Sequence, residues 1–347
     1  MKEIIYFSKS QSVNVLDQTS LPFKVKYIEA KDYKEIIKLI KKLSIRGAPA
    51  IGVAGSFAAY LAMKDLKSKS HKDLVRILTL RLKEIASARP TAINLMWAVN
   101  RFQKLLSLNS QKGYLDISKL FLKEAKYIFN HEKKVSTLIS KFGTSILFDN
   151  CKVLTHCNTG SLATTGPGTA LGVIKMANKK YKGIKVYATE TRPLMQGSRL
   201  TVWECEQSNL DCTLITDSMV SHTIKESMVD LVIVGADRIA LNGDVANKIG
   251  TYQLAIACKY HKIPFYVAAP LSTFDFDTEK GSSILIEQRP SDEVTKIMGS
   301  RISQAKKVLN PAFDVTPNKL ISGIITEKGI IKNPKKRVII KLKDYCY

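Results

Sequence analysis

Apolar and polar positions follow three successive patterns along the chain. Between residues 4 and 27 they alternate at Val13, Val15, Phe23, Val25 and Tyr27, around a turn-like stretch at 17–22. This alternation predicts a small hairpin or a three-stranded sheet. From residue 32 to 136 the apolar positions follow the helical period. Helices are therefore predicted over residues 33–43, 51–66, 72–86, 94–107 and 117–134.

After residue 150, short apolar runs alternate with helical patterns. Strands are predicted at 153–157, 184–188, 213–215, 231–235 and 265–268, and helices at 168–179, 193–208, 218–226 and 248–261. Repeated strand-helix-strand units favour a doubly wound parallel sheet. The predicted fold class is α/β, in which a mostly helical N-terminal domain with a small antiparallel sheet (1–135) precedes a Rossmann-like catalytic domain (136–347).

Composition fits a cytoplasmic globular protein. The 347 residues, 45% of them hydrophobic, suffice for two domains. The opening segment 1–10 is too charged for a signal peptide. The apolar run 48–63 is shorter than the ~20 residues of a membrane span, so we expect a buried helix and no membrane partner. The six cysteines form no C-x-x-C pair and the histidines no H-E-x-x-H, so we expect reduced thiols and no metal.

The formal net charge of +24 raises the possibility of nucleic-acid binding. However, the lysines are scattered and no aromatic residues are interleaved with them as a stacking platform. We therefore expect a solvated lysine-rich surface and no specific nucleic-acid partner. Its field would concentrate anionic substrates, an effect that salt screens.

Cys157 lies where the first predicted strand of the second half ends. The strand runs into Thr-His-Cys-Asn-Thr-Gly at 155–160, and the glycine-rich stretch 165–169 then opens a helix. Ligands of doubly wound sheets bind at this edge, and nearby helix N-termini favour a thiolate. Cys157 is thus a candidate acid, base or nucleophile, whereas Cys205, Cys212 and Cys258 fit small buried hydrophobes. Because neighbouring strand residues face opposite ways, His156 is interpreted as structural.

The same stretch raises a rival interpretation, a nicotinamide dehydrogenase. Gly166, Gly168 and Gly172 form G-x-G-x-x-x-G, one residue longer than the dinucleotide fingerprint. The fingerprint normally follows its strand directly, but here residues 158–165 intervene and carry polar side chains suited to a sugar phosphate. The spacing therefore favours a sugar-phosphate site well above a dinucleotide site.

Asp237 ends the apolar strand 231–235 at the same edge. Apolar walls disfavour a charged carboxyl, which suits a general acid, although a helix cap or an ion pair with Arg238 is an alternative. Asn247 and Lys248 follow at the predicted start of a helix, where an amide suits a hydroxyl and a lysine suits a phosphate.

Two arginines precede predicted helices in the first half. Arg46 stands in Arg-Gly-Ala-Pro-Ala and Arg89 in Ala-Arg-Pro-Thr-Ala. A guanidinium fork beside the free N–H groups of a helix start can clamp a phosphate, although a surface ion pair is the commoner role of an arginine.

Taken together, these segments resemble the methylthioribose-1-phosphate isomerases, a family related to the regulatory subunits of the eukaryotic initiation-factor guanine-nucleotide exchange complex. The resemblance covers almost the whole chain. Its motifs lie at 16–19, 45–52, 89–92, 155–160, 190–193, 196–201, 235–239, 242–244, 247–251 and 310–317. The segment 286–291 departs from the acidic run typical of the family.

The resemblance implies that Cys157 and Asp237 are catalytic. It further implies that the substrate is held by Arg46, Gly47, Ala48, Arg89, Gln196, Asn247 and Lys248. It also implies a homodimer, without metal or nucleotide cofactor, that converts 5-methylthioribose 1-phosphate to 5-methylthioribulose 1-phosphate in methionine salvage. Isomerases of 5-deoxyribose 1-phosphate or ribose 1,5-bisphosphate, and a non-catalytic regulatory subunit, are the alternatives. A thiol and an acid together favour an enzyme.

Overall fold

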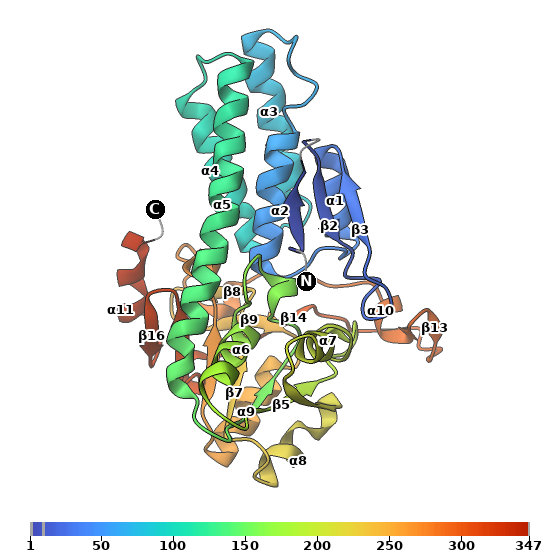
Figure 1. The fold of residues 1–347 in the computed structure, drawn as a ribbon, viewed down its shortest axis with the longest axis vertical. Coiled ribbons are helices and arrows are strands. Elements are labelled where there is room, and N and C mark those ends of the chain that lie inside the picture. The colour runs from blue at the N-terminus through green and yellow to red at the C-terminus, as the bar shows by residue number, and fades with distance from the viewer. Residues whose placement is uncertain (1–2, 9–10, 346–347) are drawn as a thin grey trace. The chain divides into compact units, whose positions relative to one another are not determined.

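The computed structural model describes residues 3–8 and 11–345. Cys346 and part of the opening segment 1–10 lie outside these residues. The chain forms two compact units, of which the first comprises Met1–Val135 and Ser161–Gly166 and the second Ser136–Gly160 and Pro167–Tyr347. The helix α5 (Tyr114–Gly143) contributes residues to both units. Each unit is described in turn (Figure 1).

The first unit begins with a three-stranded antiparallel sheet. Its strands β1 (Ile5–Phe7), β2 (Val13–Leu16) and β3 (Tyr27–Ala30) pair in chain order. The expected small sheet is therefore present. Phe23 and Val25 do not belong to it, because both lie in the β2–β3 connection with 79% and 54% of their surface exposed. Their alternation with polar neighbours is a feature of a solvated loop.

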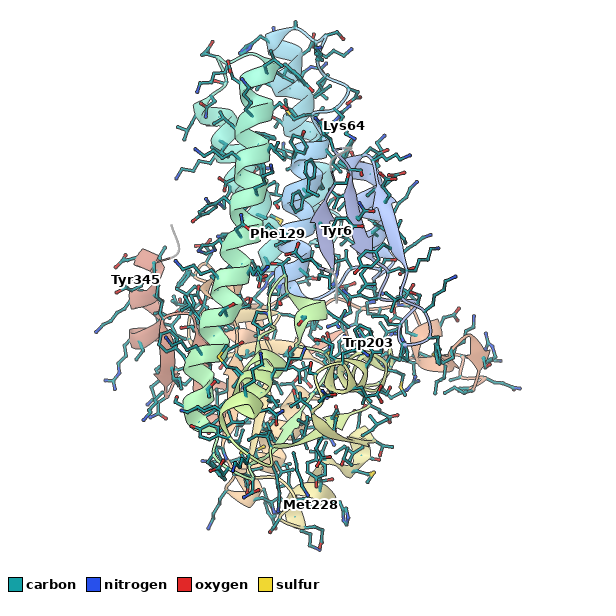
Figure 2. All side chains as sticks on the ribbon, in the orientation of Figure 1. Tyr6, Lys64, Phe129, Trp203, Met228 and Tyr345 are labelled. Atoms are coloured by element: carbon teal, nitrogen blue, oxygen red, sulfur yellow. The ribbon has the colours of Figure 1, made fainter. Side chains whose placement is uncertain are left out.

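The helices of the first unit lie close to their predicted positions. They are α1 (Tyr33–Lys41), α2 (Ala48–Leu61), α3 (His71–Ala86), α4 (Ile93–Leu108) and the N-terminal part of α5. Asp32 caps α1 by accepting the Glu35 N–H, and Ser70 caps α3 in the same way. All 14 residues of α2 are buried, as expected for an apolar run of this length. Figure 2 shows Phe129 on α5, whose ring lies 6.1 Å from that of Phe57 on α2. No helix among the described residues meets the length and hydropathy of a membrane span.

A six-residue segment, 161–166, is part of the first unit although its neighbours in sequence belong to the second. Gln18 Nε2 donates to the Leu162 carbonyl at 2.7 Å, and the Thr165 N–H donates to Glu132 at 2.6 Å. Gly47, with a φ of +89°, lies so close to Ala163 that a side chain would overlap it. These contacts explain why a boundary drawn at one point of the sequence does not describe the units.

The second unit is built on a seven-stranded sheet. Its order is β16 (Gly329–Lys332), β15 (Gly323–Thr326), β10 (Phe265–Ala268), β7 (Leu231–Val234), β4 (Lys152–Thr155), β5 (Lys185–Thr189) and β6 (Asp211–Ile215). All neighbours pair in parallel except β15 with β16. Numbered in chain order, the six parallel strands read 6-5-4-1-2-3, the doubly wound Rossmann order. The predicted fold is confirmed, with β15 and β16 as additions.

Helices connect these strands. They are α6 (Ala170–Lys180), α7 (Val202–Glu206), α8 (Val220–Lys225) and α9 (Thr251–His261), with short α10 (Asp292–Thr295) and α11 (Lys336–Ile339) further along. The predicted helix 193–208 is shorter than expected and begins with a π-helical turn at Gly197–Thr201. Every residue of β7 is buried, as expected for a central strand covered on both faces.

A second sheet, absent from the sequence-based prediction, follows β7. It has the order β11 (Phe274–Asp275), β8 (Arg238–Ala240), β9 (Val245–Lys248) and β14 (Phe313–Thr316). A hairpin of two further strands is formed by β12 (Lys296–Ile297) and β13 (Ser300–Arg301). The predicted helix start at Lys248 is therefore wrong, because Asn247 and Lys248 end β9. Gly250, in a left-handed conformation at φ +103°, turns the chain into α9.

Candidate active site

The second unit brings Cys157 and Asp237 to the point where the strand order reverses. β4 and β7 are neighbours in the sheet, and Cys157 and Asp237 follow their respective carboxyl ends. In doubly wound sheets this switch point forms the ligand-binding crevice. The two loops touch, because a methyl group on Gly235 would stand 2.9 Å from Thr159 Cγ2. Two residue types suited to proton transfer thus leave adjacent strands at the binding edge.

The backbone of Cys157 is held in an uncommon conformation. Its φ is +61°, in the left-handed region, which disfavours a non-glycine residue by roughly 1–2 kcal/mol. The Cys157 N–H donates to Thr191 Oγ1 at 2.8 Å, and the Cys157 carbonyl accepts from Thr201 Oγ1 at 2.5 Å. Two such bonds at about 0.5–1.5 kcal/mol each offset the conformational cost. The residue is 7% exposed, so its position depends on these neighbours.

Both ring nitrogens of His156 form hydrogen bonds. Its Nε2 lies 2.9 Å from the Ile249 carbonyl, which only accepts, so Nε2 carries the proton. Its Nδ1 then accepts from Thr189 Oγ1 at 2.6 Å. Burial lowers the pKa of His156, in keeping with a neutral ring. The imidazole therefore has a structural role, in which it ties the end of β4 to the start of α9.

Asp237 lies between β7 and β8 and is partly buried. Its N–H donates to the Ala246 carbonyl at 2.9 Å, which places it beside Asn247. The neighbouring Arg238 forms an ion pair with Asp275, with its Nη1 3.1 Å from Oδ2.

The end of β9 carries two of the expected substrate-binding residues. Asn247 is buried, and its Nδ2 donates to Thr251 Oγ1 at 2.9 Å. Lys248 Nζ donates to the Ala312 carbonyl at 3.0 Å and lies 5.2 Å from the centre of the Phe313 ring. These contacts orient both side chains from β14 and the first turn of α9.

Asp314 on β14 holds the start of α9. Its carboxyl accepts the N–H of Gly250 at 2.7 Å and that of Tyr252 at 3.0 Å. Burial nevertheless raises the pKa of Asp314 to about 6, so desolvation outweighs these two bonds.

Gln196 follows β5, next to the π-helical turn, and is only 4% exposed. Among the described residues, its Oε1 is buried without a hydrogen-bond partner. A buried amide oxygen left unpaired is unfavourable by about 1–3 kcal/mol. A ligand hydroxyl would satisfy it.

The other expected substrate-binding residues belong to the first unit. Arg46 directly precedes Gly47, the N-cap of α2, and Ala48 is the first residue of that helix. Arg89 lies in the turn before α4. Because Gly52 near the start of α2 packs against Asn94 near the start of α4, the two helix N-termini are adjacent. Both arginines therefore lie at one end of this helix pair, where N–H groups favour anions.

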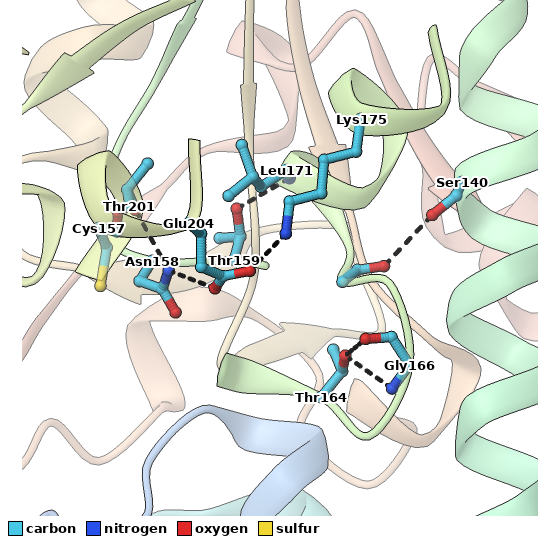
Figure 3. Close-up of polar contacts among 11 residues, drawn as sticks. Ser140, Cys157, Asn158, Thr159, Thr164, Gly166, Leu171, Lys175, Thr201 and Glu204 are labelled. Atoms are coloured by element: carbon cyan, nitrogen blue, oxygen red, sulfur yellow. Dashed lines mark hydrogen bonds and ion pairs between the residues drawn. The ribbon is translucent and has the colours of Figure 1, made fainter. Parts of the chain in front are cut away.

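Polar residues behind Cys157 form a network that the sequence did not indicate (Figure 3). Asn158 Nδ2 donates to Glu204 Oε1 at 2.9 Å, and Lys175 Nζ lies 2.5 Å from Glu204 Oε2. Lys175 and Glu204 are far apart in sequence and lie on helices without any chemical motif. Thr201 Oγ1, 3.3 Å from Asn158 Nδ2, completes the network. Of its four residues, only Asn158 and Thr201 lie within the motifs at 155–160 and 196–201. No group of three or more His, Cys, Asp or Glu residues within 3–8 and 11–345 is arranged to hold a metal ion.

Known proteins with similar sequences indicate the family of this chain. The model of the initiation factor 2 subunit family matches residues 44–333. A methylthioribose-1-phosphate isomerase of Thermoanaerobacter sp. is 47% identical over 346 residues, covering 99% of this chain and 100% of the relative.

Two solved structures agree over the whole chain. The 5-methylthioribose 1-phosphate isomerase of Pyrococcus horikoshii OT3 superposes with a TM-score of 0.90 at 38% identity, covering 99% of this chain and 96% of that one. A protein of A. fulgidus described as translation initiation factor eIF-2B, subunit delta, has a TM-score of 0.83 at 40% identity, covering 98% and 99%. The chain belongs to the initiation factor 2 subunit family and, within it, to the methylthioribose-1-phosphate isomerases.

Proposed function

We propose that this chain is an aldose-ketose isomerase that converts 5-methylthioribose 1-phosphate to 5-methylthioribulose 1-phosphate in methionine salvage. The observation that supports it most strongly is the placement of Cys157 and Asp237 after β4 and β7, at the switch point of the sheet. Relatives named for this activity match the chain from end to end.

The substrate sets a chemical problem for which this site is suited. A phosphate on the anomeric oxygen blocks the spontaneous ring opening of an ordinary aldose, so the ring must open with the phosphate attached. We assign to Asp237 the proton that the ring oxygen receives, which makes that oxygen a leaving group. A partly buried carboxyl beside apolar β7 suits this role.

Cys157 acts next on the open chain. As a thiolate it takes the proton from C2, and the electron pair forms the C1–C2 double bond of an enol-type intermediate. The Cys157 thiol then returns a proton to C1, while the C2 hydroxyl gives its proton to the Asp237 carboxylate as the C2=O bond of the ketose forms, which restores the acid. The alternative is a hydride shift within the substrate, from C2 to C1, with Cys157 and Asp237 as the assisting residues. In D2O, proton transfer places solvent deuterium at C1, whereas a hydride shift leaves C1 free of it.

Substrate binding is assigned to the remaining predicted residues. Arg46, Arg89 and the N–H groups at Gly47 and Ala48 offer charge and donors for phosphate oxygens. In the second unit, Gln196 Oε1 offers an acceptor for a sugar hydroxyl, and Asn247 and Lys248 offer further donors.

The direct test is turnover followed by phosphorus NMR, without added metal or nucleotide. The substrates are 5-methylthioribose 1-phosphate, 5-deoxyribose 1-phosphate and ribose 1,5-bisphosphate. Preference for the first supports the salvage role, and preference for another keeps the mechanism but changes the pathway. If none of the three substrates were turned over, the proposed isomerase activity would be refuted and a regulatory subunit would be favoured.

Two variants test the catalytic pair. Asp237→Asn and Cys157→Ser should each lower kcat by at least about a hundredfold, the usual contribution of one general acid or base, while substrate binding persists. Asp211→Asn, at an exposed position, and Cys258→Ala, on α9, are matched controls that should retain full activity. Wild-type activity in Asp237→Asn would remove Asp237 from the mechanism.

We also propose that the enzyme is a cytoplasmic homodimer. Tyr252, Ile256 and Tyr260 lie four residues apart on α9, and they are 40%, 46% and 81% exposed in the single chain. Such a stripe on one helix face is suited to a second copy. Sedimentation equilibrium should give twice the chain mass of 38.7 kDa, and the mass of one chain would refute the dimer.

A further inference from the structure

A buried ion pair lies behind the candidate catalytic thiol, in the second unit. Glu204 on α7 and Lys175 on α6 have only 1% and 16% of their side-chain surface exposed, and their charged atoms are 2.5 Å apart. A buried pair contributes little net stability compared with apolar side chains of the same volume, but it fixes the direction of the groups around it. The groups that this pair contacts therefore indicate its role.

The contacts of Glu204 are made to the segment that carries Cys157. Its Oε1 accepts from Asn158 Nδ2 at 2.9 Å. Its carboxylate also occupies the space that a side chain at residue 160 would need, so Gly160 allows the close approach. Figure 3 shows Glu204 and Lys175 on one side of Asn158, with Cys157 adjacent.

A second attachment comes from the same helical segment. Thr201 lies three residues before Glu204, so both side chains share one helix face. Thr201 Oγ1 donates to the Cys157 carbonyl at 2.5 Å and lies 3.3 Å from Asn158 Nδ2. Residues 157 and 158 are thus held at two points, and Cys157 has the left-handed φ of +61°.

We propose that Glu204, held in place by Lys175, is a positioning residue for Cys157. Through Asn158 it keeps the backbone of Cys157 in the left-handed conformation and so sets the direction of the thiol. The proposal rests on the proposed isomerase activity, in which that thiol moves the C2 proton. Glu204 touches no reacting atom.

Three variants perturb the network in different ways. Glu204→Gln removes the negative charge that forms the ion pair with Lys175. Lys175→Met removes the cation, and Gly160→Ala keeps every charge but displaces the Glu204 carboxylate by a methyl group. Glu206→Gln and Lys179→Met, exposed on the same two helices, are the matched controls.

The first readout is steady-state kinetics. We expect each of the three variants to lower kcat at least about tenfold, the effect of losing one charge-assisted hydrogen bond, with KM changed by less than about threefold. The controls should stay within about twofold of wild type. A positioning role predicts this split because the thiol is misplaced while the substrate contacts remain.

The second readout needs no substrate. Iodoacetamide labelling at pH 8, quantified for each cysteine by peptide mass spectrometry, should be at least threefold faster at Cys157 in the variants. Burial raises the pKa of Cys151 to about 11 and of Cys258 to about 12, so these thiols stay protonated and report only general loosening. Their labelling should not change.

Unchanged kcat and unchanged Cys157 labelling in a folded Glu204→Gln protein would overturn the proposal. Equal acceleration at Cys151, Cys157 and Cys258 would also overturn it, because the pair would then be merely structural. If Glu204→Gln does not fold, Gly160→Ala gives the same decision. Should wild-type protein turn over no sugar phosphate, the isomerase proposal fails, and labelling still decides whether Glu204 positions Cys157.

Discussion

Asp314 links the stability of the second unit to pH at a position beside the candidate site. Its carboxyl accepts the Gly250 and Tyr252 N–H groups, and its strand β14 pairs with β9, which carries Asn247 and Lys248. Replacing it by asparagine keeps the shape and an acceptor oxygen but removes the titration. The variant Asp314→Asn therefore isolates the free energy of placing a charge at this point.

The sign and size follow from the pKa of Asp314, which burial raises from 3.8 to about 6. Between these values the folded state binds more protons than the unfolded state, so the free energy of unfolding falls as pH rises. The destabilisation is absent below the unfolded pKa and complete above the folded one. Between pH 4 and pH 7 it amounts to roughly 2–3 kcal/mol.

Urea denaturation followed by circular dichroism at pH 4, 5, 6 and 7 measures this quantity. The difference in unfolding free energy between wild type and Asp314→Asn should shift by about 2–3 kcal/mol in favour of the variant from pH 4 to pH 7. The exposed Asp211→Asn on β6 is the matched control and should follow wild type. If the difference in unfolding free energy between wild type and Asp314→Asn stayed constant from pH 4 to pH 7, the hydrogen bonds from Gly250 and Tyr252 would offset the desolvation of the carboxylate. That result would refute the predicted pH dependence.

Three further predictions concern the surroundings of the site. Thr201→Val removes the hydroxyl that donates to the buried Cys157 carbonyl and should lower the unfolding free energy by about 1–3 kcal/mol. Thr201→Ser keeps this hydroxyl and should lose only about 0.8 kcal/mol for a methyl group, and urea denaturation compares the two variants. Gly250→Ala places a side chain at a φ of +103° and a methyl group 3.0 Å from the His156 ring. It should lower the unfolding free energy by at least ~1 kcal/mol more than Gly299→Ala, where φ is +87° but the surrounding space is open. Equal losses of stability in thermal melts of the two variants would contradict this. The charge of +24 should make KM rise severalfold between about 20 and 300 mM NaCl while kcat stays constant; an unchanged KM would exclude steering by the surface field.

Regular periodicity explains why much of the fold was predictable. The helices α1 to α5 lie within a few residues of their predicted ranges except at the C-terminal end of α5, because each buries one face or, for α2, its whole surface. The strands β4, β5, β7 and β10 were found because central parallel strands are continuous apolar runs. The same feature located Cys157 and Asp237, since both follow such runs.

Tertiary pairing explains what was missed. The strands β8, β9, β11 and β14 are two to four residues long, and β14 reaches β9 from more than 60 residues away. No local period marks such strands, so Asn247 and Lys248 were assigned to a helix start. Lys175 and Glu204 cannot be identified from the sequence for a similar reason. A single charged residue on an amphipathic helix is normally solvated, and only packing shows that these two are buried against Asn158.

The order of strands in the sheet places Cys157 and Asp237 after neighbouring strands, although they are far apart in the sequence. Along the chain, two strands (β5 and β6) separate β4 from β7, so Cys157 and Asp237 are 80 residues apart. They follow neighbouring strand ends because the chain first builds the sheet outward from β4 through β5 and β6, and then returns to place β7 on the other side of β4. Only at this reversal do the connecting segments leave in opposite directions and open a crevice between adjacent strands. A thiol after β5 or an acid after β10 would lie at the same sheet edge but outside that crevice. The placement of the two proposed catalytic residues at adjacent strand ends is therefore a consequence of topology, and we expect that moving either residue to the end of the next strand abolishes turnover even if the fold is unchanged.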